Sequence, residues 1–317
     1  MEYRDRRGVL LGLGLVLLAA GIGCAFLGPV EVYAFYLFSE GGRFAYEGFR
    51  FGWFMFGNIA LQVTGYYLAA AVLVPLGYGH VRLRRWTRPL ALALLWTWAA
   101  LGVPLLLVLF FMTASVKSFS TAGGVAFVVL LALSYFVLPW LGIRFYRGRN
   151  VRGTFEAHDR GPIAVEARPV PVLVLCLLDI FFLIALHVPL LFNGLFPLFG
   201  TLQGGMAGFY LVDLSVLALA LLLWGTWEQR AWALWGSAAY YGVLAAAWIV
   251  TFARTPYAAL LAWLKLPPTE IEILSGIPLR GWEIGAFVGL PMLVCAGVVL
   301  GCRRWFGRRA AGAYGGA

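Results

Sequence analysis

The sequence predicts an all-α integral membrane protein with about eight transmembrane helices arranged as two parallel-repeat four-helix bundles. Three observations predict this fold class: the composition, eight apolar runs of spanning length, and arginines confined to alternate loops. Of the 317 residues, 62% are hydrophobic and 12% are charged, with a mean hydropathy of +0.87. Soluble domains contain about 25% charged residues, so we expect this chain to lie in a lipid bilayer.

The apolar runs each approach the roughly 20 residues needed to cross a hydrocarbon layer about 30 Å thick. Lipid offers no hydrogen bonds to peptide groups, so each run must form a helix. The predicted spans are residues 8–28, 52–78, 89–113, 122–142, 170–192, 206–225, 231–252 and 284–301.

The net charge of +10 could suit nucleic acid, so its distribution along the chain has to be considered. If the spans alternate in direction, 18 of the 24 Lys and Arg residues fall on one side of the membrane. Cytoplasmic loops are enriched in Lys and Arg, which predicts a multi-pass protein of a cell membrane, the prokaryotic cytoplasmic membrane, with both termini cytoplasmic. The charge therefore indicates orientation and attraction to anionic lipid, and we expect no nucleic-acid partner.

The segments between spans predict two transmembrane halves. Residues 143–169 are basic and contain several Gly and Pro residues, which is typical of a linker. We therefore expect a first half at 1–149, a cytoplasmic linker at 150–169 and a second half at 170–317. On the external side, residues 29–51 combine aromatic and charged side chains and are expected to cap the first half.

The second large external segment, 253–283, contains an apolar stretch that is too short to span. Arg254 and Lys265 flank this stretch, which favours an interfacial or re-entrant helix. After two prolines, Thr269 is followed three residues later by Glu272, an arrangement typical of a capping box. A short helix is expected to begin there.

An internal repeat relates the two halves. A shift of 159 residues places 141–149 over 300–308 with five identities. Because each half has an even number of spans, both copies would enter the membrane in the same direction, as in transporters with parallel repeats, whose substrate sites lie between the halves. The alternative is that apolar helices with basic ends resemble one another by composition alone.

Ionisable groups inside the spans are the candidate functional residues, because an Asp at the centre of a membrane helix costs roughly 3 kcal/mol unless it is paired or faces water. Counting helical rise from the span boundaries places several polar side chains at similar depths. We therefore expect a polar binding cluster from the middle of the membrane toward its outer face. The competing interpretation is that Asn58 and Gln62 form hydrogen bonds between helices and that Asp213 pairs with His187 or a Tyr, without binding a ligand. The cluster consists of Asn58, Gln62, Asp179, His187 and Asp213.

No cofactor, metal centre or catalytic residue is expected. The four cysteines lie in or beside apolar runs without metal-ligand spacing, and His80 and His158 are isolated in the predicted cytoplasmic segments, where solvation is expected. The sequence contains no HExxH, GxSxG, Walker A or GxGxxG motif.

The features above favour transport or permeation of a small solute through a polar site between the two halves. One alternative is a non-catalytic anchor or quinone-contacting subunit of a larger complex. Another is a lipid-modifying membrane enzyme with a lateral opening lined by carboxylates. A non-enzymatic role is favoured, with the lipid bilayer and a small-molecule substrate as partners.

Overall fold

The computed structural model describes residues 4–39, 41–44, 49–115, 121–159, 161, 165–277 and 279–307. Within these residues, eight helical stretches are long and apolar enough to cross a membrane, as the sequence predicts. The helices that form them are α1 (Arg7–Phe38), α2 (Phe54–Val81), α3 (Thr87–Ser115), α4 (Thr121–Ala132) with α5 (Leu138–Arg147), α7 (Val170–Ala185), α8 (Gly205–Trp227), α9 (Ala231–Arg254) and α12 (Gly281–Gly301).

The remaining elements are short. They are the π-helix η1 (Leu133–Val137) between α4 and α5, α6 (Arg149–His158), the 3-10 helices η2 (Val188–Phe192) and η3 (Arg303–Trp305), strands β1 (Phe196–Leu198) and β2 (Thr201–Gln203), α10 (Tyr257–Leu264) and α11 (Pro268–Ser275). The two strands pair antiparallel, with Phe196 opposite Gln203. The sequence analysis predicted no strand there.

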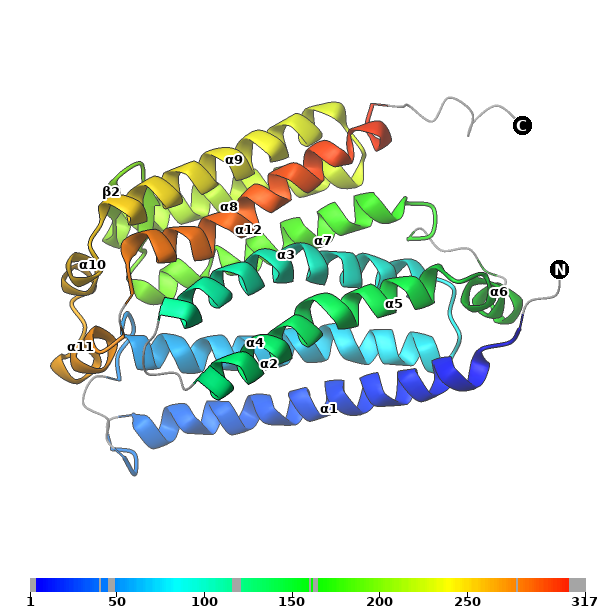
Figure 1. Cartoon of the computed structure of the whole chain (residues 1–317), viewed down its shortest axis with the longest axis horizontal. Coiled ribbons are helices and arrows are strands. Elements are labelled where there is room, and N and C mark those ends of the chain that lie inside the picture. The colour runs from blue at the N-terminus through cyan, green and yellow to red at the C-terminus, as the bar shows by residue number, and fades with distance from the viewer. Residues whose placement is uncertain are drawn as a thin grey trace.

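The long helices run side by side, and the bundle has two different ends (Figure 1). Helix α1 begins and α12 ends at the same end, beside α6 (Figure 1). We call this the basic end, because its segments carry the predicted majority of the arginines. Helices α10 and α11 and the β-hairpin lie at the opposite end, which we call the far end (Figure 1).

The first helix is longer than predicted. Its span was expected to end at residue 28, but α1 continues through Pro29 to Phe38. A proline inside a helix removes one backbone hydrogen bond and does not by itself end a membrane helix. At about 1.5 Å per residue, 32 residues extend about 48 Å, so α1 projects beyond a hydrocarbon layer of about 30 Å. Part of the expected external cap is therefore helical, and Phe35 packs edge-on against Phe56 with ring centroids 5.3 Å apart.

Glycines allow α1 and α2 to pack closely. Gly14, Gly21 and Gly28 are buried at seven-residue intervals along α1. A Cβ added at Gly14 would lie 2.8 Å from the Cβ of His80, too close for any side chain. Small residues at such crossings let backbones approach, which is a main source of helix association in lipid.

The buried side chains form two hydrophobic cores. One core extends from Leu10 to Phe155 and is built by α1, α2, α3, α5 and α6. The other extends from Val172 to Phe306 and is built by α7, α8, α9 and α12, with Ala93 of α3 joining it. Val170 packs against both cores, and α3 contacts both α7 and α12. The two cores thus meet along α3 and the start of α7.

The expected linker is partly a helix. Residues 149–158 form α6, which buries Val151, Thr154 and Phe155 in the first core. The apolar residues of α6 lie on one face, so the segment can pack against the bundle while its arginines stay solvated.

The short helices of the far end confirm one prediction and correct another. Helices α10 and α11 occur where an interfacial helix and a short helix were expected. The predicted capping box at Thr269 and Glu272 is wrong, because α11 begins after Pro267 and has no side-chain cap. Instead, the carboxylate of Glu270 accepts hydrogen bonds from the backbone N–H groups of Phe54 and Met55, each at 2.9 Å. Glu270 of α11, 3% exposed, therefore caps the first turn of α2.

We predict that Glu270→Ala lowers the free energy of unfolding by about 1–2 kcal/mol, because two helix N–H groups lose their acceptor. Thermal unfolding of the purified protein in detergent would measure this change. The matched control is Glu272→Ala, which removes an exposed carboxylate from the same helix and should change stability by less than about 0.5 kcal/mol. Equal effects of the two substitutions would contradict the capping role.

Candidate functional site

The five residues of the predicted polar cluster have different surroundings. The Gln62 amide donates to Asn58 Oδ1 at 3.0 Å, and both side chains are exposed on α2. His187 is exposed and its Nδ1 pairs with the carbonyl of Leu183 at 2.7 Å. Asp213 is exposed on α8. Among the described hydrogen bonds, only the one between Asn58 and Gln62 joins two members of the cluster, so the binding role of the five residues stays a prediction.

Asp179 is the buried member of the set. Its carboxylate is 1% exposed and accepts a hydrogen bond of 2.7 Å from the hydroxyl of Tyr241, which is 0% exposed. The bond joins α7 to α9 inside the second core. A buried polar group needs a partner, and this interhelical bond supplies one for one oxygen of the Asp179 carboxylate.

The first core contains a comparable pair. His80 is 0% exposed, and its Nε2 pairs with the hydroxyl of Tyr146 while its Nδ1 pairs with the carbonyl of Leu76. The expectation of a solvated His80 is therefore wrong. His80 lies near the end of α2, but its ring points inward against α5 and α6. The ring centroids of His80 and Phe155 are 6.0 Å apart.

We predict that Tyr241→Phe destabilises the protein by about 1–3 kcal/mol, because it removes the donor to a buried carboxyl group. Unfolding midpoints in detergent would measure the loss. Tyr240→Phe is the control, since the Tyr240 hydroxyl donates to the carbonyl of Ser215 at 3.1 Å in a half-buried position. In an Asp179→Leu background, Tyr241→Phe should have little further effect, and full additivity would contradict the pairing.

A groove between the two cores is the larger of the two cavities described. It has a volume of about 1070 Å³ and is lined by α3, η1, α5, α7 and the end of α12. Most of its wall is apolar, including Trp96, Val103 and Phe136. Since α3 and α5 belong to the first core and α7 and α12 to the second, the groove lies where the two cores meet.

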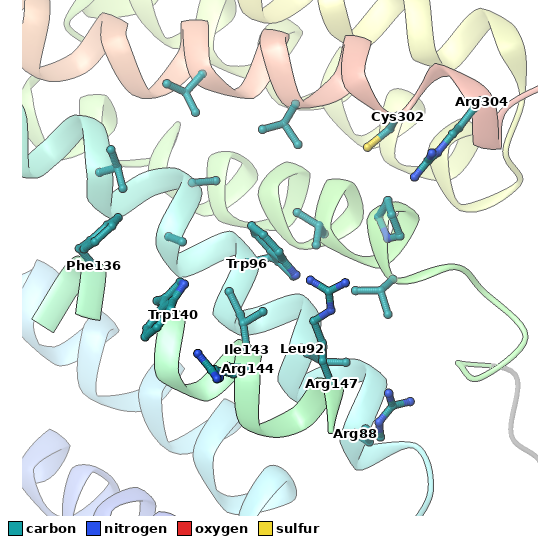
Figure 2. A pocket seen from close by; sticks show the side chains of 18 residues that line it. Arg88, Leu92, Trp96, Phe136, Trp140, Ile143, Arg144, Arg147, Cys302 and Arg304 are labelled. Carbon is teal, nitrogen blue, oxygen red and sulfur yellow. The ribbon is translucent and has the colours of Figure 1, made fainter. Parts of the chain in front are cut away.

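Four arginines line the basic end of this groove. Arg88 lies on α3, Arg144 and Arg147 lie on α5, and Arg304 lies just after the end of α12. Figure 2 shows Phe136 at one end of the groove and Arg88 and Arg304 toward the other, with Arg147 beside Trp96. The groove thus combines an apolar interior with a positively charged mouth, and no carboxylate is among the described residues that line it.

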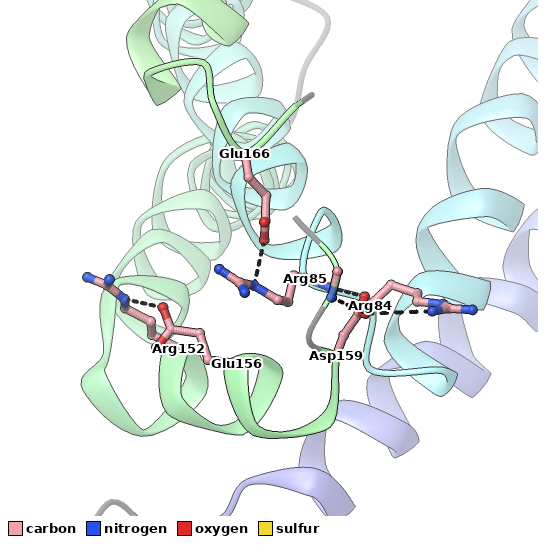
Figure 3. Close-up of polar contacts among 7 residues, drawn as sticks. Arg84, Arg85, Arg152, Glu156, Asp159 and Glu166 are labelled. Atoms are coloured by element: carbon pink, nitrogen blue, oxygen red, sulfur yellow. Dashed lines mark hydrogen bonds and ion pairs between the residues drawn. The ribbon is translucent and has the colours of Figure 1, made fainter. Parts of the chain in front are cut away.

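The described carboxylates of the basic end pair with other groups. Asp159 lies 3.7 Å from Arg84, and Glu166 accepts from Arg85 Nε at 3.1 Å (Figure 3). Three further contacts join Glu156 to Arg152, Glu228 to Arg168 and Asp5 to the backbone N–H of Arg7. No ion pair in the described part of the chain involves the four groove arginines. Glu156 acts on Arg88 only through space and forms its ion pair with Arg152, so none of the four arginines has a carboxylate in direct contact among the described residues.

Contacts to neutral groups position these arginines. Arg88 Nε donates to the carbonyl of Tyr146 at 2.9 Å, which joins α3 to α5. The guanidinium of Arg144 lies 5.7 Å from the ring centroid of Trp140, and that of Arg304 lies 5.2 Å from the ring of Trp305. Cation–π contacts of this kind hold a guanidinium in place without consuming its charge.

A smaller cavity of about 310 Å³ adjoins the mouth of the groove. It shares Arg88 and Val170 with the groove and is lined by Arg85, Arg152, Arg168, Glu156 and Glu166, among others. Its wall is polar where that of the groove is apolar. The two cavities together extend the basic surface from the end of the groove to the face of α6.

A π-helix lies beside the groove. Helix η1 contributes Phe136, and its neighbour Tyr135 packs against Gly102 of α3, where an added Cβ would lie 2.6 Å from the Tyr135 ring. Single π turns inside longer helices re-aim side chains and are frequent at functional sites. Here the π turn directs Phe136 to the groove while Tyr135 packs on α3.

Cys302 lines the groove beside Arg304. Burial raises the pKa of its thiol, and the charge of Arg304 partly opposes this effect. Burial thus disfavours the thiolate, which is the nucleophilic form of cysteine.

The sequence analysis interpreted the arginines of the groove only as an orientation signal. A second signal was present in the spacing, because Trp140, Arg144 and Arg147 follow one another at four and three residues and so share one helix face. On α3, Arg88, Leu92 and Trp96 share a face in the same way. Arginine and tryptophan on one helix face, with the arginines nearer the basic end, form the sequence pattern of this site.

Comparisons of the chain with protein-family models, with curated proteins and with solved structures found no match. The geometry of the groove therefore carries the functional argument. A site with an apolar interior and unneutralised arginines at its mouth can hold an anionic group at the arginines and apolar groups beyond them.

Proposed function

We propose that the chain is a membrane transporter for an anionic substrate, which it binds in the groove between its two halves. One observation carries this proposal: four arginines without ion-pair partners in the described residues line one end of a cavity of about 1070 Å³. Arginines are common at the cytoplasmic ends of membrane helices, but four of them around one cavity create a positive potential that attracts an anion into it.

The proposal includes the two-half architecture and the orientation. Two separate hydrophobic cores support a first half at 1–149 and a second half at 170–317, related by a parallel repeat. The excess of arginine supports a cytoplasmic basic end in a prokaryotic cell membrane. Under this orientation the groove takes its substrate from the cytoplasmic side, which differs from the outer position expected for the polar cluster.

The groove is less suited to the two alternative functions. A lipid-modifying enzyme that uses carboxylates for acid–base chemistry needs them in its site, and the groove lining contains none. A quinone presents a neutral head group, which would leave the guanidinium groups without a counter-charge. An anionic substrate that also carries apolar groups would match both the positive charge of the mouth and the apolar wall.

Transport can be measured in proteoliposomes with two probes, radiolabelled inorganic phosphate and a fluorescent phosphatidylglycerol whose transfer between leaflets is followed by dithionite quenching. We predict movement of at least one probe. The triple variant Arg144→Gln/Arg147→Gln/Arg304→Gln should reduce the rate at least about tenfold, since each lost charged contact costs about 1.5–3 kcal/mol.

The control is Arg82→Gln/Arg149→Gln/Arg303→Gln, which removes the same charge from exposed positions of the basic end outside both cavities. Its rate should stay within about twofold of the unsubstituted protein. Equal losses in the two triple variants, or no movement of either probe, would contradict the proposal. Asp213→Asn tests the polar cluster separately, because Asp213 lines neither cavity.

A further inference from the structure

We infer that the ligand of the groove is a phosphate-bearing membrane lipid, with its phosphate among the four arginines and an acyl chain along the apolar wall. This inference deepens the proposed function by assigning its substrate class. It concerns binding, however, and can be tested whether or not the protein transports the lipid. Three properties of the groove lead to it: charge, length and the position of its tryptophans.

The charge of the groove selects an anion that guanidinium groups bind well. Arg144, Arg147 and Arg304 are exposed around the mouth, and Arg88 is half-buried at its base. Arginine matches the geometry of phosphate through paired N–H donors, and several arginines around one phosphate share its oxygens. No carboxylate lines the groove to compete for these donors.

The length of the groove separates a lipid from a small anion. Along α3 its lining runs from Arg88 to Val103, a rise of about 22 Å for 15 residues. Half of a hydrocarbon layer about 30 Å thick is about 15 Å, so the groove is deep enough for the chain of a lipid in one leaflet. Inorganic phosphate would occupy only the mouth and leave the apolar wall at Trp96, Val103 and Phe136 without a ligand.

The tryptophans support the same placement. Trp96 and Trp140 line the groove at the part of its apolar wall that is nearer the arginines, and they are 44% and 52% exposed. Tryptophan is enriched at the level of lipid headgroups, where one edge of the ring is solvated and the other contacts acyl chains. The contact of Arg144 with the ring of Trp140 fixes the boundary between the charged and apolar parts of the groove.

The test uses the full-length protein in phosphatidylcholine vesicles that contain phosphatidic acid with a diazirine in the middle of one acyl chain. After illumination, mass spectrometry maps the adducts. We expect them to be enriched about tenfold in peptides that contain the groove positions Ala99, Val103, Phe136 and Val294, relative to the exposed positions Val16 and Phe26 of α1.

Two variants separate the charged from the apolar contribution. Arg144→Gln/Arg147→Gln/Arg304→Gln should lower groove labelling about tenfold, while Arg82→Gln/Arg149→Gln/Arg303→Gln should leave it within twofold. Ala99→Trp fills part of the apolar wall without changing charge and should also lower the labelling. Thermal unfolding in detergent confirms that each variant is folded, and the exposed positions of the substituted arginines favour this outcome.

Three results would overturn the inference. Labelling that is equal on α1 and in the groove would show no site, and equal groove labelling by a diazirine phosphatidylcholine would show that charge does not select the ligand. Absence of groove labelling, together with binding of radiolabelled inorganic phosphate that is lost in the Arg144→Gln/Arg147→Gln/Arg304→Gln variant, would assign the site to a free anion. Groove labelling without movement of either probe in proteoliposomes would leave the lipid site standing and remove the transport function.

Discussion

The structure depends on one constraint: a lipid bilayer offers no partner to an unpaired peptide group or to an isolated charge. The constraint makes every long apolar run a helix and drives the polar groups that remain among the helices to find partners in the protein. The carboxylate of Glu270 accepts from the backbone N–H groups at the start of α2, and the Tyr241 hydroxyl donates to one carboxylate oxygen of Asp179 in the second core. The four groove arginines lie at the basic end of the bundle, where lipid does not force them into ion pairs, and they are free to bind an anion.

Helix α3 joins the two cores, because it packs against α7 and α12 of the second core as well as against α5 of the first. Glycines bring α1 against α2, and in the second core Gly289 of α12 meets the side chain of Ile249 on α9 closely. The groove is the opening beside the contacts of α3 with α7 and α12, and it is lined by side chains from both cores. Its position supports a substrate site where the two cores meet.

The positions of the eight spanning helices could be predicted from the sequence because hydropathy and length determine them directly. Most boundaries agree within a few residues, and α1 differs because the sequence analysis ended its span at Gly28, before Pro29. Contacts between residues far apart in the sequence were harder to predict. The capping of α2 by Glu270 joins residues more than 200 positions apart, and Thr269 and Glu272 offered a local alternative that the structure does not use.

The candidate site, too, could be predicted only in part from the sequence. Residue depth along a helix can be counted from its boundary, but the direction of each side chain depends on packing, so Asp179 turned inward while Asp213 is exposed. The groove arginines bear on both the orientation of the chain and ligand binding. Only the orientation follows from counting Lys and Arg residues in alternate loops. The inference of binding required knowing that Asp159 and Glu166 pair with Arg84 and Arg85 and leave Arg144 and Arg147 unneutralised.

The most direct test of the central constraint is the side of the membrane on which each end of the bundle lies. Single cysteines at positions 149, 272 and 303, in a background that lacks the four native cysteines, can be labelled with an impermeant maleimide in intact cells. The account predicts labelling of position 272 from outside and of positions 149 and 303 only after permeabilisation. Labelling of 149 and 303 from opposite sides, or of 272 from the same side as 149, would contradict it.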